Sequence, residues 1–326
     1  MASETFYSQI ATNKRQSILL AVILGLILGV FGFSIGIALG GSASTGVIAT
    51  LIAVGLAVLL SLGSYFGGDQ LVLATSKARE VDPAAAPQLM NVVQEIAIAA
   101  NIPMPKVYVI DDSAPNAFAT GRDPQHASVA VTSGLLDKMD REELQGVLGH
   151  ELSHVRNYDI RFTLLVGVLV GSVALLSDFF LRYTFWFGGG RRDDREEGGG
   201  GGIQAVFMIV ALIMAVLAPI ASSLVQLAVS RQREYLADAS SVELTRNPHG
   251  LERALATIAS DKEVLEVASR ATQHLYFTNP IKKFEARSAG LMSTHPPIVD
   301  RINRLRELTG EAPLDPAETQ ALSGLD

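Results

Sequence analysis

The sequence predicts a mainly α-helical membrane protein that also carries a soluble α+β domain with a small β-sheet. Three observations lead to this fold class. Nearly half of the 326 residues are hydrophobic (48%) and the mean hydropathy is positive, as expected of a membrane protein with a folded soluble part. Four long apolar stretches suit transmembrane helices. The remaining segments show the periodicities of short strands and amphipathic helices.

The N-terminal part of the chain is predicted to form a transmembrane hairpin. No charged residue occurs in residues 16–68, which is long enough for two helices of about 20 residues across a hydrocarbon core about 30 Å thick. We place them near 17–39 and 45–66, and their glycines suit close helix contacts. A cleaved signal peptide is the alternative for the first stretch, although that stretch is long for one.

Two further apolar stretches predict a second hairpin, near residues 162–180 and 203–229. Asp178 interrupts the first of them, so we expect this aspartate near the far membrane interface. A glycine-rich link with mixed charges joins the two stretches. The alternative is that this pair lies in or on the membrane less fully.

Basic residues near the span ends predict the orientation. Every span has such residues at the same end of its hairpin, and the positive-inside rule places that end in the cytoplasm. The link after the third span also carries arginines, but acidic residues balance them. The basic residues that set the orientation are Lys14, Arg15, Lys77, Arg79, Arg156, Arg161, Arg231 and Arg233.

Composition limits the chemistry and the partners. The chain has no cysteine, so any bound metal must be held by His, Asp or Glu. The net charge of −7, with no basic run, argues against a nucleic-acid partner. A lipid bilayer is the partner that the apolar stretches predict.

The segment His150-Glu151-Leu152-Ser153-His154 indicates a metal centre. On a helix, histidines four residues apart share one face and can bind one ion. A catalytic zinc takes three protein ligands and leaves a position for water, and Glu151 stands where a general base is needed. The alternative is a pair of ordinary surface histidines.

The flanking sequence supports a helix here. Asp140 followed by Glu143 matches a capping box, and no proline occurs between Asp140 and Arg161. We therefore expect both histidines to lie within one continuous helix. If this helix continues to the third span, His154 lies about 12 Å before Phe162, which puts the metal just above the membrane surface.

The third metal ligand is predicted to be Glu234. This residue leaves the fourth span at the same membrane surface, so an antiparallel pair of spans brings it beside His150 and His154. Asp238 lies one helical turn further and can hold a ligand imidazole by its second nitrogen. The alternative is a solvated ion-pair face made with Arg231 and Arg233.

Two short strands are predicted before the motif helix, at Lys106–Ile110 and Ala127–Thr132. Between them, residues 116–119 are interpreted as an exposed edge strand to which an extended peptide adds by main-chain hydrogen bonds. Asn116 and Ala117 are then candidate substrate-binding residues. A simple turn after Pro115 is an alternative interpretation that these residues support equally well.

His295 is a further candidate, since it lies in Thr294-His295-Pro296-Pro297. A threonine and prolines also mark a helix start, so structural capping is one interpretation. A contact to the substrate or its oxyanion is the other.

Taken together, these motifs resemble those of the HtpX-type bacterial membrane zinc metalloproteases, relatives of the CAAX prenyl proteases. The resemblance extends from about Ile18 to about Arg304, and the link at 188–202 departs from it as low-complexity sequence. The segments that carry the resemblance are 105–110, 116–122, 149–159, 230–238 and 294–297.

The resemblance implies a gluzincin-like, cytoplasm-facing endopeptidase of the cell inner membrane that serves membrane-protein quality control and the stress response. It implies one Zn²⁺ on His150, His154 and Glu234, with Glu151 catalytic. It also favours Asp238 as the support of a ligand, and Asn116 and His295 as substrate-side residues. The substrates would be polypeptides, in the main membrane proteins.

The predicted domain organisation interleaves two hairpins with two parts of a catalytic domain. Zinc would polarise the scissile carbonyl while Glu151 moves a proton from water to the leaving amine. A prenyl-peptide protease and a zinc-binding membrane protein without protease activity are the alternatives. The four parts are a hairpin at 1–68, the motif helix and its sheet at 69–161, a hairpin at 162–230, and the third ligand with C-terminal helices at 231–326.

Overall fold

The structure of the chain is a computed structural model that describes residues 6–187, 201–261, 263 and 296–323. The chain divides into two compact units. The membrane unit comprises residues 1–65 and 162–226, and the α/β unit comprises residues 66–161 and 227–326. Each unit therefore contains two separate stretches of the sequence.

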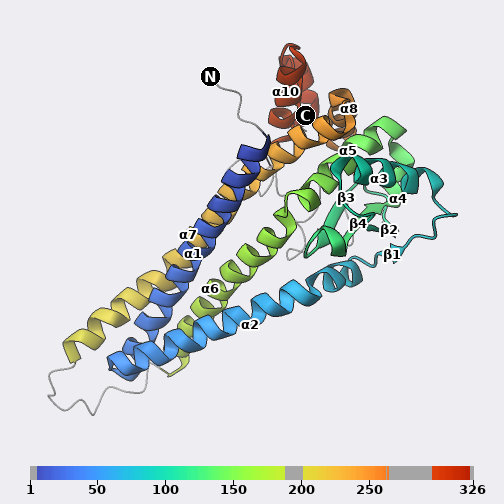
Figure 1. The fold of residues 1–326 in the computed structure, drawn as a ribbon. Helices are drawn as coiled ribbons and strands as arrows, with labels where there is room; N and C mark the ends of the chain where they lie inside the picture. The colour runs from blue at the N-terminus through green and yellow to red at the C-terminus, as the bar shows by residue number, and fades with distance from the viewer. Residues whose placement is uncertain (1–5, 188–200, 262, 264–295, 324–326) are drawn as a thin grey trace. The chain divides into compact units, whose positions relative to one another are not determined.

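Four long helices contribute the membrane unit (Figure 1): α1 (Phe6–Gly40), α2 (Ala43–Thr75), α6 (Asp159–Phe187) and α7 (Gly201–Thr245). Each contains a segment long and apolar enough to cross a membrane. The predicted fold class, with about four membrane helices and a small sheet, is confirmed. The candidate spans are Ala21–Gly40, Ala43–Thr75, Val166–Trp186 and Gly202–Leu224.

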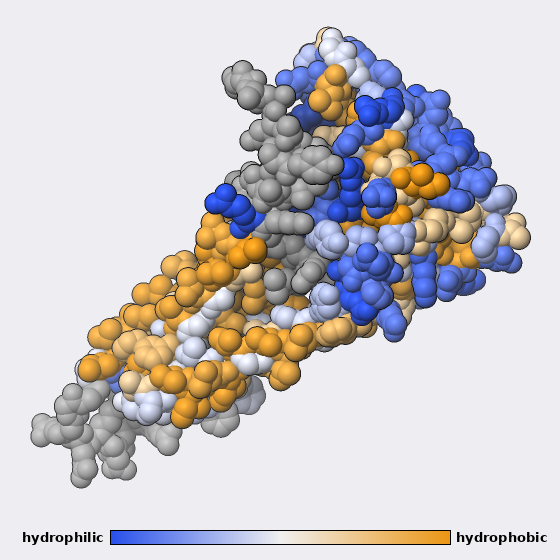
Figure 2. Space-filling view, viewed as in Figure 1, coloured by the Kyte–Doolittle hydropathy of each residue, from blue (hydrophilic) through white to orange (hydrophobic). Residues whose placement is uncertain are grey.

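Small and aromatic residues hold these helices together. Phe31 packs edge-to-face on Phe180, with ring centroids 6.4 Å apart. At Gly36 an added Cβ would lie 2.4 Å from the carbonyl oxygen of Thr45, so only glycine permits this approach of α1 to α2. Many leucines, isoleucines and valines of the unit are exposed, and Figure 2 shows a mainly hydrophobic surface over its helices, as lipid contact requires.

The α/β unit is built on a four-stranded sheet in the order β1-β2-β4-β3. β2 (Lys106–Ile110) and β4 (Ala127–Thr132) pair in parallel and have the predicted bounds. β3 (Ala117–Gly121) pairs antiparallel with β4 and is an edge strand. The expectation that this edge is exposed is wrong, because all five residues of β3 are buried. The remaining strand, β1 (Arg79–Glu80), pairs with β2.

Helices surround the sheet (Figure 1), and the motif helix α5 (Arg141–Arg156) is central among them. It contacts β3, β4, α3 and α8. The predicted capping box at its start is confirmed, since Asp140 accepts from the Glu143 N–H and Glu143 accepts from the Asp140 N–H. The other helices are α3 (Pro87–Ala100), α4 (Ser133–Lys138), α8 (Pro248–Ser260), α10 (Ile298–Thr309) and α11 (Pro316–Ser323), with a 3₁₀ turn at Pro124–His126.

Both motif histidines lie in one continuous helix, α5, as predicted, but this helix does not continue into the third span. α5 ends at Arg156, Tyr158 adopts a left-handed φ of 60°, and α6 begins at Asp159. The break turns the Asp159 carboxylate back to within 3.1 Å of the His154 ring. The bonds of Asp159 to its neighbours offset the unusual conformation of Tyr158, which costs of order 1 kcal/mol.

Candidate metal centre

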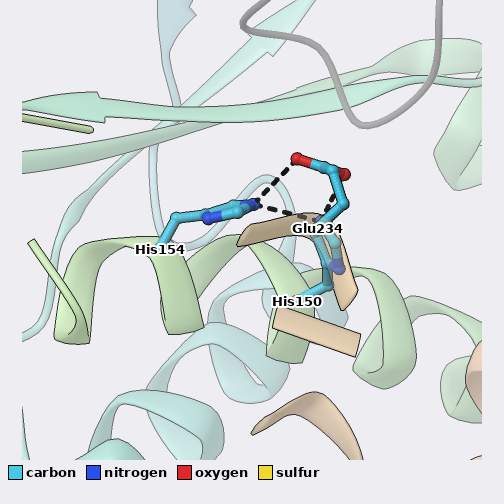
Figure 3. Close-up of side chains that lie close together, drawn as sticks. All are labelled: His150, His154 and Glu234. Atoms are coloured by element: carbon cyan, nitrogen blue, oxygen red, sulfur yellow. Dashed lines mark hydrogen bonds and ion pairs between the residues drawn. The ribbon is translucent and has the colours of Figure 1, made fainter. Parts of the chain in front are cut away.

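The two motif histidines lie side by side on α5. His150 is fully buried, and the side chain of His154 is 15% exposed. Their Nε2 atoms are 3.2 Å apart and face the same point (Figure 3). The spacing of four residues produces this arrangement because one helical turn separates the rings.

The structure brings Glu234 of α7 to these rings. Its Oε2 lies 3.4 Å from Nε2 of His150, and its Oε1 lies 3.5 Å from Nε2 of His154 (Figure 3). Donor atoms of the three residues all lie within 4.8 Å of one another. Two nitrogens and a carboxylate oxygen at this separation fit the ligand set of a divalent transition metal.

Gly149 on α5 allows α7 to come this close. A Cβ on Gly149 would lie 2.7 Å from the Ser241 Oγ. The Ser241 hydroxyl donates to the Gly146 carbonyl oxygen at 2.7 Å. The residue directly before His150 thus leaves room for the helix that carries Glu234.

Asp238 supports His150, as its position one turn beyond Glu234 predicts. His150 Nδ1 lies 2.8 Å from Asp238 Oδ1, which leaves Nε2 directed at the ligand site. Burial alone would raise the pKa of Asp238, but Arg301 and His150 outweigh it and lower that pKa below its usual value. The carboxylate is therefore ionised at neutral pH.

A second carboxylate supports His154, and sequence reasoning missed it. Asp159 Oδ2 lies 3.1 Å from His154 Nδ1, and Arg233 donates to the Asp159 carbonyl oxygen at 3.0 Å. Burial lowers the pKa of His154, but the bonds to Asp159 and Glu234 outweigh it and raise that pKa to about 10. A continuous helix would have placed Asp159 off the histidine face, so the sequence offered no signal for it.

Glu151 is buried beside the histidines, and its carboxylate accepts a hydrogen bond from the Ala119 N–H of β3 at 2.8 Å. Burial raises the pKa of Glu151, although His150 and His154 partly offset this effect. A carboxyl group that binds a proton readily and is fixed by a strand is suited to proton transfer.

The charges around the three ligand residues also fit a divalent cation. Four buried carboxylates meet two buried guanidinium groups there, so the carboxylates outnumber the guanidinium groups by two, and without a metal a proton on His154 offsets only part of this excess. Buried charge needs a partner, and one divalent ion supplies the missing charge. The carboxylates are Glu151, Asp159, Glu234 and Asp238, and the guanidinium groups are Arg233 and Arg301.

A second cluster, of His249, Glu252 and Glu311, fits a metal less well. Its donor atoms also lie within 4.8 Å of one another, but His249 and Glu311 are exposed. Arg306 already donates to Glu252 at 2.6 Å. Exposed ion pairs of this kind are common on protein surfaces, so we place the metal centre at the buried cluster.

The substrate-side candidates lie as follows. Asn116 is buried, and its side-chain oxygen accepts from the N–H of Ala117 at 2.9 Å. The Thr132 N–H donates to the Asn116 carbonyl oxygen. The alternation of antiparallel pairing then directs the N–H and C=O groups of Ala117 and Ala119 away from β4. His295 lies outside the described residues.

Comparisons with known proteins agree with this geometry. Peptidase family M48 matches residues 83–309. The chain is 45% identical to a protein named "Protease HtpX homolog" from Streptococcus uberis, over 93% of this chain and 99% of that protein. Proteins of the same name from Streptococcus agalactiae and Listeria monocytogenes are 46% and 45% identical over the same shares.

A solved structure shows the same fold. The crystal structure of Ste24p from S. mikatae superposes with a TM-score of 0.51 and 20% sequence identity. The match covers 90% of this chain and 66% of that one, so this chain spans slightly less than two thirds of the Ste24p length.

Proposed function

The chain belongs to peptidase family M48 and is a membrane metalloprotease, and from this premise we propose that it is a zinc-dependent endopeptidase of the cell inner membrane. Its catalytic residues face the cytoplasm in this proposal. Its substrates are polypeptides, in the main misfolded or damaged membrane proteins. The resemblance inferred from the sequence motifs, to the HtpX-type proteases, is confirmed by the comparisons.

The observation that carries the proposal is the buried cluster of His150, His154 and Glu234, with Glu151 beside it. Two histidines and a glutamate are the protein ligands of a well-known class of catalytic zinc sites. Because the chain has no cysteine, the ligands must be imidazole and carboxylate groups, a set that suits zinc.

The residues of the chain divide the catalytic work. When bound, zinc supplies a Lewis acid that polarises a carbonyl oxygen and makes a water molecule more acidic. Glu151 accepts the proton of the attacking water and delivers it to the leaving amine. The bond from the Ala119 N–H fixes the Glu151 carboxylate, and Asp238 and Asp159 orient His150 and His154.

An extended peptide is the substrate form that suits the edge strand. The N–H groups of Ala117 and Ala119 already donate to Asn116 and Glu151. The carbonyl oxygens of the same two residues point away from β4 and can accept hydrogen bonds from a substrate strand, and Asn116 lies at the start of this edge. Unfolded segments of damaged proteins supply such extended chain. The named proteases among the relatives support a peptide substrate.

The test is a cleavage assay with the detergent-purified full chain and an unfolded protein substrate. We expect chelation to abolish cleavage and added zinc to restore it. Glu151→Gln should retain zinc but lower kcat by about 10²–10⁴-fold, the usual contribution of a general base. Glu142→Gln, an exposed change on the same helix, is the matched control and should cleave normally.

Three results would contradict the proposal. They are cleavage that survives chelation, a Glu151→Gln enzyme as fast as the wild type, and wild-type protein that binds no zinc. Comparing prenylated and unprenylated peptides distinguishes an endopeptidase from a prenyl-peptide protease. Zinc flux into liposomes without proteolysis would favour the non-proteolytic alternative.

A further inference from the structure

Helix α10 places two arginines on the turn of α7 that carries Glu234. Arg301 binds Asp238, and the Arg304 guanidinium lies 3.6 Å from the centre of the Tyr235 ring. The ligand residue Glu234 is thus one residue from one of these contacts and four residues from the other. The C-terminal part of the chain therefore meets the metal centre directly.

Arg301 is almost completely buried, with 1% of the residue exposed. Its Nε donates to Asp238 Oδ2 at 2.9 Å, and a terminal nitrogen donates to Oδ1 at 2.7 Å. This two-pronged bond fixes the plane of the carboxylate. The same Oδ1 lies 2.8 Å from His150 Nδ1, so the orientation of Asp238 sets that of the imidazole.

Arg301 also lies close to the third ligand. Its other terminal nitrogen is 3.8 Å from Glu234 Oε2, the oxygen that is 3.4 Å from His150 Nε2. One guanidinium group therefore restrains both a ligand carboxylate and the carboxylate that supports a ligand histidine.

We propose that Arg301 is a positioning residue of the metal centre, which orients His150 through Asp238 and so sets the affinity and geometry of the bound metal. This proposal rests on the zinc site of the proposed function. Because Arg301 is on α10, it makes docking of that helix a condition for a complete metal site.

A purely structural role is the competing explanation. Burying a guanidinium group is costly, and an apolar side chain of similar volume stabilises a fold at least as well. The neighbouring Arg306 shows what an ordinary pair on α10 looks like, since it binds Glu252 at 2.6 Å with its side chain 20% exposed. It provides a matched control on the same helix.

The experiment measures zinc affinity by chelator competition, and the absorption spectrum of the cobalt-substituted protein, for the full detergent-purified chain. The variants are Arg301→Met, Arg301→Lys, Asp238→Asn, the double variant Asp238→Asn with Arg301→Met, and the control Arg306→Met. Thermal unfolding of each variant without metal measures stability separately from metal binding.

We expect Arg301→Met to bind zinc about 10–100-fold more weakly, as loss of an outer partner does elsewhere, and to shift the cobalt spectrum. Arg301→Lys should recover part of the affinity, and Arg306→Met should match the wild type. The double variant should lose less zinc affinity than the two single losses combined, because Arg301 acts mainly through Asp238 and to a smaller extent on Glu234 directly. It should nevertheless be more stable than Arg301→Met, since the buried Asp238 carboxylate that loses its guanidinium partner is replaced by a neutral amide.

Three outcomes would overturn the proposal while leaving the zinc site intact. They are wild-type zinc affinity and cobalt spectrum in Arg301→Met, losses that simply add in the double variant, and an equal loss in Arg306→Met. If Arg301→Met does not fold, the same decision rests on Arg301→Lys and the double variant. A wild-type chain that binds neither metal would instead contradict the proposed function.

Discussion

Protons and metal compete for His154. Its pKa is raised from the ordinary 6.5 to about 10, because the bonds to Asp159 and Glu234 outweigh the opposing effect of burial. The imidazole therefore holds a proton throughout the neutral range, whereas a metal ligand must be deprotonated. His154 is well placed to bind a metal, and its raised pKa makes that binding sensitive to pH.

We predict that zinc affinity rises by about tenfold per pH unit between pH 7 and 9, since one proton must leave His154. With an ordinary histidine pKa of 6.5, the rise would level off below pH 7. Asp159→Asn removes one cause of the raised pKa, so the rise should end at a lower pH. Chelator competition over a pH series measures both proteins, and an affinity that is flat above pH 7 in the wild type would contradict the prediction.

Among the elements, α5 depends on glycine where it meets its neighbours. A Cβ on Gly146 would lie 2.6 Å from the backbone nitrogen of Leu251 at the start of α8. Backbone atoms cannot turn aside as a flexible side chain does, so this contact has to be relieved by moving a helix. Such a movement would also disturb His150, one turn further along α5.

Gly146→Ala should therefore lower the free energy of unfolding by about 1–3 kcal/mol, the usual cost of overpacking. The better helix propensity of alanine, worth up to about 1 kcal/mol, offsets part of this cost. Gly67→Ala is the control, because nothing lies within 4 Å of its added Cβ. Thermal unfolding compares the two, and equal midpoints would show that the α5–α8 contact yields easily.

At the scale of the whole molecule, the basic residues flanking the spans predict which ends face the cytoplasm. Ser44, in the first turn of α2, then lies outside, and Lys106, at the start of β2, lies inside. Both are exposed in the structure. The absence of cysteine from the natural chain makes single cysteines at these positions specific labels.

In intact spheroplasts, a membrane-impermeant maleimide should label Ser44→Cys at once and Lys106→Cys only after lysis. The physical reason is the cost of moving the basic flanks across the bilayer during insertion. Labelling of Lys106→Cys alone before lysis would show the opposite orientation. Labelling of both variants before lysis would indicate that a hairpin does not span the membrane.

Local patterns were sufficient to predict much of the fold. Uncharged runs predicted the membrane helices, alternation predicted β2 and β4 with their bounds, and Asp140 with Glu143 predicted the start of α5. These features depend on residues that are neighbours along the chain, so the sequence alone is sufficient to predict them. The placement of Glu234 needed one step more, the antiparallel return of a span.

Contacts between distant segments were decided only by the tertiary structure. The left-handed turn at Tyr158 brings Asp159 to His154, packing buries β3, and α10 delivers Arg301 to Asp238 across 63 residues. The sequence by itself determined which side chains are able to bind a metal and that membrane helices flank them. Which carboxylates and arginines support those ligands depends on the free energy of packing the whole α/β unit, and no local pattern encodes that choice.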